Sequence, residues 1–399
     1  MADRVINFGV IGIGAGFKGL FKAFVDHPGV KIVAASDVRQ DALDAFKQNY
    51  GVDTYLNPED LCKNPNVEAV WIAAPNQFHA PLAIMAAEHK KHIIVSKPMA
   101  VTLDECKAMI AAADKNGVKL MAGHTQGILP GIRKMAALVR SGEYGRLEMI
   151  NSWNYTPWIY RPRLPQELDE STGGGVVFRQ SPHHIDMVRI IGGGMVRSVR
   201  AMTRIADPSR PVPGIFAAYL EFTDGVPCTI VYNGYGHFDS SEITFPETKA
   251  SRGNEPAEAL VRGGAVSADQ EAAMKEARRF TGGAAEAQGG GGDGGGLSPF
   301  GLTIASMAKA DIRQDHNGVV IYQNGKAEHI ALSKGEARGY PELEELYQAV
   351  VNGREVVHDG RWGLATQEVT DAINLSAREH KEIIMQYQVP FPEGAPLGF

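Results

Sequence analysis

The sequence predicts a two-domain α/β protein, with an N-terminal Rossmann domain and a C-terminal α+β domain that has a largely antiparallel open sheet. The chain has 399 residues, which is too long for one typical domain. Up to about residue 123, apolar β-branched runs alternate with segments of helical spacing, whereas strand-like runs follow one another later. We therefore expect one domain at residues 1–124 and a second at residues 125–399.

The first part of the chain has the alternation that is typical of a parallel sheet. Strand-like runs lie at residues 5–11, 31–36, 69–73, 92–95 and 119–122, and helical segments lie at residues 17–25, 41–50, 80–87 and 103–116. Strands that alternate with helices predict a parallel sheet with right-handed crossovers. Such sheets bind their ligands at the carboxyl ends of the strands.

The second part has a different pattern. A helix is expected at residues 132–140, strand-like runs at 146–154, 196–205, 215–222, 228–233 and 319–323, and further helices at 185–191, 341–351 and 362–385. Strands in succession predict mainly antiparallel pairing. Pro341 begins a helix, because proline is favoured in the first helical turn.

Residues 239–299 form an insertion of low apolar content with glycine runs at residues 289–292 and 294–296. A run this rich in glycine has too much backbone entropy to be held rigid, and we therefore expect a flexible loop or tether. The insertion is either a spacer without function or a lid or arm that reaches a neighbouring subunit.

The composition argues against several classes of function. The net charge is −6 and no run of five basic residues occurs, so we expect no nucleic-acid partner. No stretch of 18 apolar residues occurs, so we expect no membrane partner. The cysteines Cys62, Cys106 and Cys228 lack metal-ligand spacing, which predicts free thiols, no metal site and a cytoplasmic protein.

A glycine-rich turn follows the first strand-like run. Gly12 would allow the tight turn and Gly14 would let the backbone approach a pyrophosphate, which then faces the N-terminus of a helix. Phe17 takes the third position of this motif in place of glycine. A shifted register, with Gly14, Gly16 and Gly19, begins further from the strand, so we prefer the first. The turn predicts a dinucleotide cofactor.

Asp37 stands at the end of the second strand-like run. A carboxylate there accepts hydrogen bonds from ribose hydroxyls and repels a 2′-phosphate, which favours NAD over NADP. Arg39 leaves NADP as an alternative, and Asp37 could instead cap the helix that begins near residue 41.

Two further strand ends carry polar residues. Pro75, Asn76 and His79 follow the third strand-like run, where the last two would lie beside the nicotinamide half of the cofactor or cap the next helix. Lys97 follows the fourth run beside Pro98, an unusual place for a lysine with a purely structural role. The alternative for Lys97 is a solvated surface lysine.

These motifs, with Gly173-Gly174-Gly175 before His183, together resemble the glucose-fructose oxidoreductase, inositol dehydrogenase and rhizopine catabolism family (Gfo/Idh/MocA). The resemblance covers nearly the whole chain and implies that Lys97 contacts the nicotinamide ribose and the reacting hydroxyl. Ser96 replaces the glutamate of the family's Glu-Lys-Pro motif. Arg179 replaces the aspartate of its Asp-x-x-x-His motif, whose histidine is His183. The loss of that aspartate weakens a sugar or polyol assignment.

Within the family, the chain is most similar to phthalate dihydrodiol dehydrogenases, at residues 154–156, 160–163 and 173–178 and from residues 300–301 to 321–322. This similarity implies NAD-dependent oxidation of cis-4,5-dihydro-4,5-dihydroxyphthalate to a catechol. Planar guanidiniums bind carboxylates bidentately, so Arg161, Arg163 and Arg179 are candidate ligands for an anionic substrate, with Tyr160 beside them. Each arginine could instead serve a structural ion pair.

His183 is the first candidate for the base, because an imidazole titrates near neutral pH. Lys97 could share this role, and Asp186, three residues after His183, is a candidate orienting and substrate-binding residue. Alternatives are a sugar or inositol dehydrogenase, an NAD-dependent glycosidase, or a non-catalytic NAD-binding protein. The family resemblance also implies a homodimer or homotetramer formed through the open sheet face.

Overall fold

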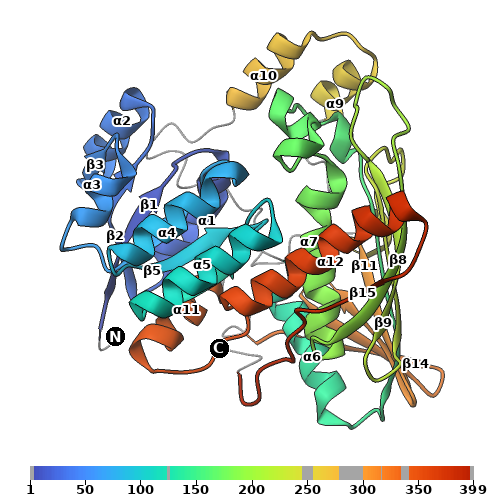
Figure 1. The fold of residues 1–399 in the computed structure, drawn as a ribbon. Helices are drawn as coiled ribbons and strands as arrows, with labels where there is room; N and C mark the ends of the chain where they lie inside the picture. The colour runs from blue at the N-terminus through green and yellow to red at the C-terminus, as the bar shows by residue number, and fades with distance from the viewer. Residues whose placement is uncertain are drawn as a thin grey trace.

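A computed structural model describes residues 4–123, 126–244, 255–277, 300–315, 317–333 and 341–395. Figure 1 shows a Rossmann domain, coloured blue to teal, beside a second domain built on a larger sheet. Within the described residues, no helix combines the length and the apolar character that are needed to cross a membrane.

The Rossmann domain has six parallel strands in the order β3-β2-β1-β4-β5-β6. Its elements are β1 (Ile6–Ile11), α1 (Ala15–Asp26), β2 (Val30–Ser36), α2 (Gln40–Tyr50), β3 (Asp53–Tyr55), α3 (Pro58–Lys63), β4 (Ala69–Ile72), α4 (His79–Glu88), β5 (His92–Ser96), α5 (Leu103–Asn116) and β6 (Leu120–Gly123). This is the doubly wound order, and the sheet changes direction between β1 and β4, where such folds bind nucleotides. The predicted parallel sheet is confirmed; β3 and α3 were not predicted.

The second domain has nine strands in the order β14-β13-β12-β11-β7-β10-β9-β8-β15. Its elements are α6 (Pro130–Ser141), β7 (Leu147–Tyr155), α7 (Gly175–Gly192), β8 (Val196–Arg204), β9 (Ile215–Phe222), β10 (Pro227–Asn233), α8 (Ser241–Thr244), α9 (Glu255–Arg262), α10 (Ala268–Glu276), β11 (Leu302–Met307), β12 (Ala310–Asp315), β13 (Gly318–Gln323), β14 (Lys326–Ala331), α11 (Pro341–Val351), α12 (Gly360–Glu379) and β15 (Ile383–Ile384). All pairs are antiparallel except β7 with β10, so the expectation of a largely antiparallel sheet is confirmed.

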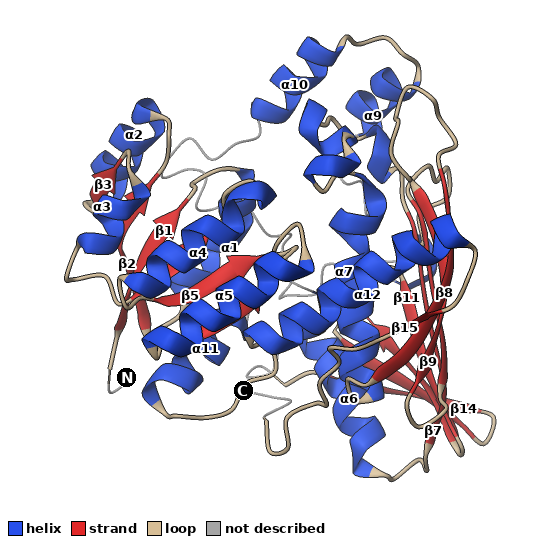
Figure 2. Ribbon diagram, in the orientation of Figure 1, coloured by secondary structure: helices blue, strands red, loops and turns tan. Residues whose placement is uncertain are grey.

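One face of this sheet is covered and the other is open. Helices α6, α7 and α12 lie against one face (Figure 2). Strand register places Trp153, Met202, Tyr219 and Tyr322 on the opposite face, where each side chain is exposed. The open face is therefore rich in large apolar side chains.

Helix α11 joins the two domains. It begins at Pro341 as predicted, although it belongs to the second part of the chain. Its residues Leu343, Leu346 and Tyr347 pack into the core on one side of the Rossmann sheet. The first domain therefore takes part of its core from the C-terminal segment.

Several predicted elements differ from the structure. Helix α7 begins at Gly175 rather than at residue 185, because Pro182 and the glycines hide its helical pattern. Helix α12 ends at Glu379 rather than at residue 385, because His380 takes a left-handed conformation with φ 54° and a short strand follows.

The prediction of a flexible loop at residues 239–299 is wrong for part of this segment. Helices α8, α9 and α10 occupy residues 241–244, 255–262 and 268–276, and α10 begins with a capping box between Ser267 and Gln270. The glycine runs of residues 289–296 lie outside the described residues.

Candidate active site

The glycine turn has the geometry that a pyrophosphate site requires. Strand β1 ends at Ile11, and Gly12 follows with φ +91°, a conformation that side chains rarely allow. A Cβ on Gly12 would lie 3.0 Å from the backbone of Ala73, whereas nothing lies within 4 Å of a Cβ on Gly14. Helix α1 then begins at Ala15. The space at Gly14, in front of a helix N-terminus, fits the phosphates of a dinucleotide.

The expected cofactor contact of Phe17 is not supported. Its side chain is fully buried and packs against Phe21, Phe24 and Phe46. The aromatic ring packs between α1 and α2, on the core side of the glycine turn, and so stabilises that turn.

Asp37 lies against the same turn. Its Oδ2 accepts a hydrogen bond from the Ile13 amide at 2.9 Å, and its Oδ1 accepts from the Arg39 amide and Nε, each at 3.0 Å. Arg39 also donates to the Ile13 carbonyl. The carboxylate and the guanidinium thus stand together where the adenosine ribose binds in doubly wound folds.

The segment after β4 contributes one spare donor. Pro75 precedes a short 3-10 helix (Asn76–Phe78), and Asn76 is buried. Its Nδ2 has no hydrogen-bond partner among the described residues, and a Cβ on Gly173 would lie 3.1 Å from it. A buried donor without a partner is costly, so the Asn76 amide fits a bound polar group between the domains.

His79 differs from its expected role in cofactor binding. Its Nδ1 lies 2.9 Å from the carbonyl of Pro98, and its Nε2 lies 2.8 Å from that of Ala74. Burial lowers the pKa of the imidazole. His79 therefore positions the turn that carries Lys97.

Lys97 follows β5 and reaches the second domain. Its Nζ donates to the carbonyl of Arg179 on α7 at 2.7 Å. Burial lowers its pKa to about 7, and the positive charges of Arg179 and Arg163 add to the shift. The solvated-lysine alternative does not fit this environment. Ser96, which replaces the family's glutamate, accepts a hydrogen bond from Trp71 Nε1 at 3.1 Å.

Helix α7 carries Arg179 and His183 one turn apart, on the same face. Pro182 has no amide hydrogen, so the carbonyl of Phe178 lacks its usual helical hydrogen bond. The carbonyl of the next residue, Arg179, accepts the hydrogen bond from Lys97. The His183 ring is buried and lies edge-on to Phe300, with ring centroids 4.9 Å apart. Burial lowers the pKa of the neighbouring His184 to about 3, so that residue stays neutral at physiological pH. Lys97 therefore contacts α7 one turn before His183.

Three cations converge on one carboxylate beside Lys97. The Oε1 of Glu167 lies 3.3 Å from Arg179, 3.5 Å from Lys275 and 3.6 Å from Arg163. Burial would raise the pKa of Glu167, but Arg163, Lys275 and Arg179 outweigh it and hold the pKa at about 2. Arg163 also stacks on Trp158 at 3.6 Å. This group of Lys97, Arg163, Glu167, Arg179 and Lys275 is called the cation cluster below.

Tyr160 and Arg161 do not join the cation cluster, in contrast to their expected substrate contacts. Arg161 pairs with Glu258 of α9 at 3.2 Å. The Tyr160 ring lies under the guanidinium of Arg262, also on α9, at 4.2 Å. Both residues therefore anchor the insertion.

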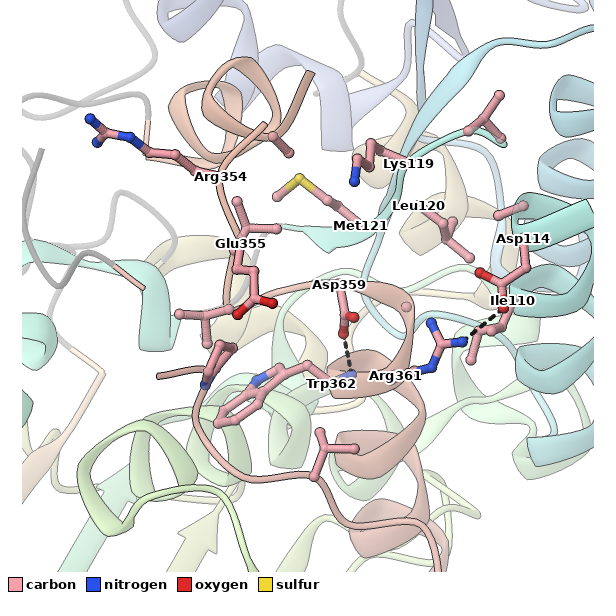
Figure 3. Close-up of a pocket in the computed structure, with 18 of the residues that line it drawn as sticks. Ile110, Asp114, Lys119, Leu120, Met121, Arg354, Glu355, Asp359, Arg361 and Trp362 are labelled. Carbon is pink, nitrogen blue, oxygen red and sulfur yellow. Dashed lines mark hydrogen bonds and ion pairs between the residues drawn. The ribbon is translucent and has the colours of Figure 1, made fainter. Parts of the chain in front are cut away.

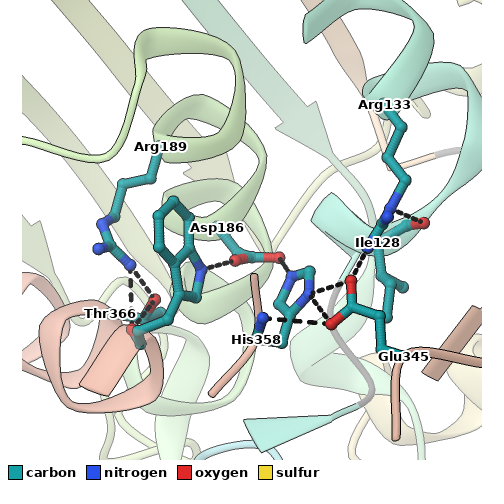
Figure 4. Close-up of polar contacts among 8 residues, drawn as sticks. Ile128, Arg133, Asp186, Arg189, Glu345, His358 and Thr366 are labelled. Carbon is teal, nitrogen blue, oxygen red and sulfur yellow. Dashed lines mark hydrogen bonds and ion pairs between the residues drawn. The ribbon is translucent and has the colours of Figure 1, made fainter. Parts of the chain in front are cut away.

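Asp186 has other partners than the expected ones. Its carboxylate accepts a hydrogen bond from Trp362 Nε1 at 2.6 Å and lies 3.1 Å from His358 Nε2, and Figure 4 shows the contact with His358. His358 also bonds to Glu345, which pairs with Arg133. This buried network holds α7 against the C-terminal segment, so Asp186 positions α7 and is not placed to bind substrate.

A cavity of about 420 Å³ lies elsewhere between the domains (Figure 3). It borders Lys119 and Leu120 at the start of β6, away from the carboxyl end of the sheet. Arg361 on its wall pairs with Asp114. Ligands of doubly wound sheets bind at the opposite edge, so this cavity is not the active site.

Sequence reasoning missed Glu167 and Lys275. Both depend on the packing of the insertion against the segment before α7. A local signal was present for α10, because Ser267 and Gln270 have the spacing of a capping box. No local signal marks Glu167.

Residues 6–124 match the GFO_IDH_MocA family, described as an oxidoreductase family with an NAD-binding Rossmann fold, and residues 132–248 match the GFO/IDH/MocA C-terminal domain. The chain is 33% identical over 381 residues to a 1-carboxy-3-chloro-3,4-dihydroxycyclo hexa-1,5-diene dehydrogenase of Comamonas testosteroni, covering 92% of this chain and 94% of the relative.

Solved structures give the same architecture. A proposed dehydrogenase from Bordetella bronchiseptica RB50 has a TM-score of 0.88 at 33% identity, over 96% of this chain and 100% of that one. The WlbA dehydrogenase of Bordetella pertussis, in complex with NADH and UDP-GlcNAcA, has a TM-score of 0.70 at 20% identity, over 97% and 99% of the two chains. The second likeness concerns the fold alone.

The Asp37–Arg39 pair makes a prediction about the cofactor. Asp37→Ala should lower the ratio of kcat/KM for NAD to that for NADP by about tenfold or more, because it removes the carboxylate and frees Arg39 for a 2′-phosphate. Asp41→Ala removes an exposed carboxylate nearby and is the matched control. In Asp37→Ala, kcat/KM for NADP should rise, and the double variant with Arg39→Ala should lose that rise. An unchanged ratio in Asp37→Ala would count against its ribose role.

Proposed function

Because the chain belongs to the Gfo/Idh/MocA family of NAD-dependent oxidoreductases, we propose that this dehydrogenase oxidises cis-4,5-dihydro-4,5-dihydroxyphthalate to the catechol 4,5-dihydroxyphthalate. The observation that carries the proposal is the cation cluster, in which Arg163, Arg179 and Lys275 share the carboxylate of Glu167 and Lys97 lies beside them. A carboxylated substrate would supply the missing negative charge.

The relative from Comamonas testosteroni supports the substrate class. Its name describes a substrate with one carboxyl group and two neighbouring hydroxyl groups on a cyclohexadiene ring. Arg179 also stands where the family's sugar-oxidising pattern has an aspartate. We therefore favour an anionic diol over neutral sugars and inositols.

The cofactor is NAD, which supplies the hydride acceptor when bound. The residues present fit it: Gly12 and Gly14 leave room for the pyrophosphate, Asp37 lies at the ribose position, and Asn76 keeps a spare donor. Arg39 keeps NADP as an alternative.

Lys97 is the base that the geometry favours. With a pKa of about 7, it is deprotonated in much of the protein at neutral pH and can take the proton of the reacting hydroxyl. The Arg179 carbonyl orients its Nζ. His183 lies one turn further along α7 and can share or relay the proton. The ketone that forms enolises to the catechol, and this aromatisation draws the reaction forward.

We further propose a cytoplasmic homodimer or homotetramer that covers the open face of the nine-stranded sheet. The exposed side chains of Trp153, Met202, Tyr219 and Tyr322 on that face support this assembly, because large apolar patches favour association.

Formation of NADH tests the substrate directly. Purified protein with NAD should reduce the cofactor rapidly with cis-4,5-dihydro-4,5-dihydroxyphthalate and little with myo-inositol or glucose. Lys97→Ala should lower kcat with the diol by about 10² to 10⁴-fold, because it removes the base. Turnover with the polyols alone would overturn the proposed substrate, and near-normal turnover of Lys97→Ala would remove Lys97 from the mechanism.

The pKa of Lys97 predicts a pH profile. A base acts when deprotonated, so the rise of kcat/KM for the diol with pH should have its midpoint near pH 7, whereas an ordinary lysine, with a pKa of 10.5, would place that midpoint far higher. This rise of kcat/KM near pH 7 should remain in His183→Asn and should be absent from the residual activity of Lys97→Ala. The reverse pattern would make His183 the base.

A further inference from the structure

The insertion is fastened to the substrate side of the protein. The family match in the second domain ends at residue 248, before α9 and α10. Glu271 of α10 accepts from the Arg163 amide and pairs with Arg210, each at 2.7 Å. Lys275, one turn later on α10, lies 3.5 Å from Glu167. In Figure 1, α10 extends toward the Rossmann domain. The insertion therefore places a cation next to Arg163 and Arg179.

We propose that Lys275 binds a carboxylate of the substrate, so that the insertion makes the site selective for dianions over monoanions and neutral diols. This inference rests on the proposed function for the identity of the substrate. It goes further by assigning a substrate ligand on α10 and by making that residue the origin of the preference for a dianion.

The charges of the cation cluster support two carboxylates. Lys97, Arg163, Arg179 and Lys275 face Glu167, which leaves a formal charge of +3, or +2 when Lys97 is neutral. Arg163 is 7% exposed. The side chains of Arg179 and Lys275 keep 22% and 24% of their surface exposed, so a ligand can reach them, and a ligand with about two negative charges would balance the charge of the cluster.

The contacts within the cluster also leave donors for a ligand. The three distances to Glu167 range from 3.3 to 3.6 Å, longer than the roughly 2.7–2.9 Å of a strong charged hydrogen bond. The Nε atoms of Arg163 and Arg179 are buried and have no partner in the described part of the chain. Burial, and then the positive charges of Arg163 and Arg179, lower the pKa of Lys275 to about 8, and a bound carboxylate would raise it again. If the pair of Lys275 with Glu167 only fastened the insertion, we would expect shorter contacts and no unpaired Nε atoms on Arg163 and Arg179.

Binding of phthalate, benzoate and catechol to the NAD-loaded protein, measured by titration calorimetry, tests the inference without turnover. Lys275→Met should weaken phthalate binding by about tenfold to a hundredfold, the loss expected for one charged contact, and should change catechol binding little. Lys275→Arg should restore most of the affinity. Lys309→Met, which removes an exposed lysine on the β11–β12 turn, is the charge-matched control. Unchanged phthalate affinity in Lys275→Met, or equal losses for phthalate and catechol, would overturn the inference.

A pH profile with an uncharged cis-dihydrodiol gives a second readout. Lys275 lowers the pKa of Lys97 and Glu167 raises it. The midpoint should therefore move to higher pH in Lys275→Met and to lower pH in Glu167→Gln. Shifts in the same direction, or none, would place Lys275 outside the cluster. Failure of wild-type turnover with the phthalate diol would instead count against the proposed reaction, and the binding measurement would still decide the role of Lys275.

Discussion

The site depends on one hydrogen bond between the domains, in which the Lys97 ammonium donates to the backbone carbonyl of Arg179 at 2.7 Å. It brings the carboxyl end of the Rossmann sheet against α7. The pKa of Lys97 falls to about 7 because of burial and then because of the positive charges of Arg179 and Arg163, against the hydrogen bond itself, which favours the charged form. The contact between the domains thus places the base in the surroundings that leave it partly deprotonated at neutral pH.

Other buried contacts hold this hydrogen bond in place. The buried His79 ring lies between the carbonyls of Ala74 and Pro98, 2.8 Å and 2.9 Å from its nitrogens, and so helps to fix the turn that carries Lys97. On the far side of α7, Asp186 is held by Trp362 and His358. Buried charges are stable only when they are well paired, and removing one partner typically costs about 3–5 kcal/mol. The network around Asp186 therefore links α7 through His358 to Glu345 of α11, the helix that packs into the Rossmann core.

The parts of the site that the sequence could predict are those at strand ends. Parallel strands bring their carboxyl ends to one edge, so the positions of Gly12, Asp37 and Lys97 along the chain were enough to group them. The residue types of Phe17 and Asp186 did not reveal which way their side chains point, and both face a core instead of a ligand. Lys275 lies about a hundred residues from Arg179, in a segment with a low apolar content. Only the packing of α10 brings it to the cluster, which no local pattern encodes.

A crystal structure with NAD and phthalate bound would show whether the cation cluster binds the substrate's carboxylates. We expect the two carboxylates of phthalate to lie within hydrogen-bond distance of Arg163, Arg179 and Lys275, with the ring edge facing Lys97. Phthalate bound elsewhere, or carboxylates directed away from these cations while Glu167 keeps all three, would contradict it.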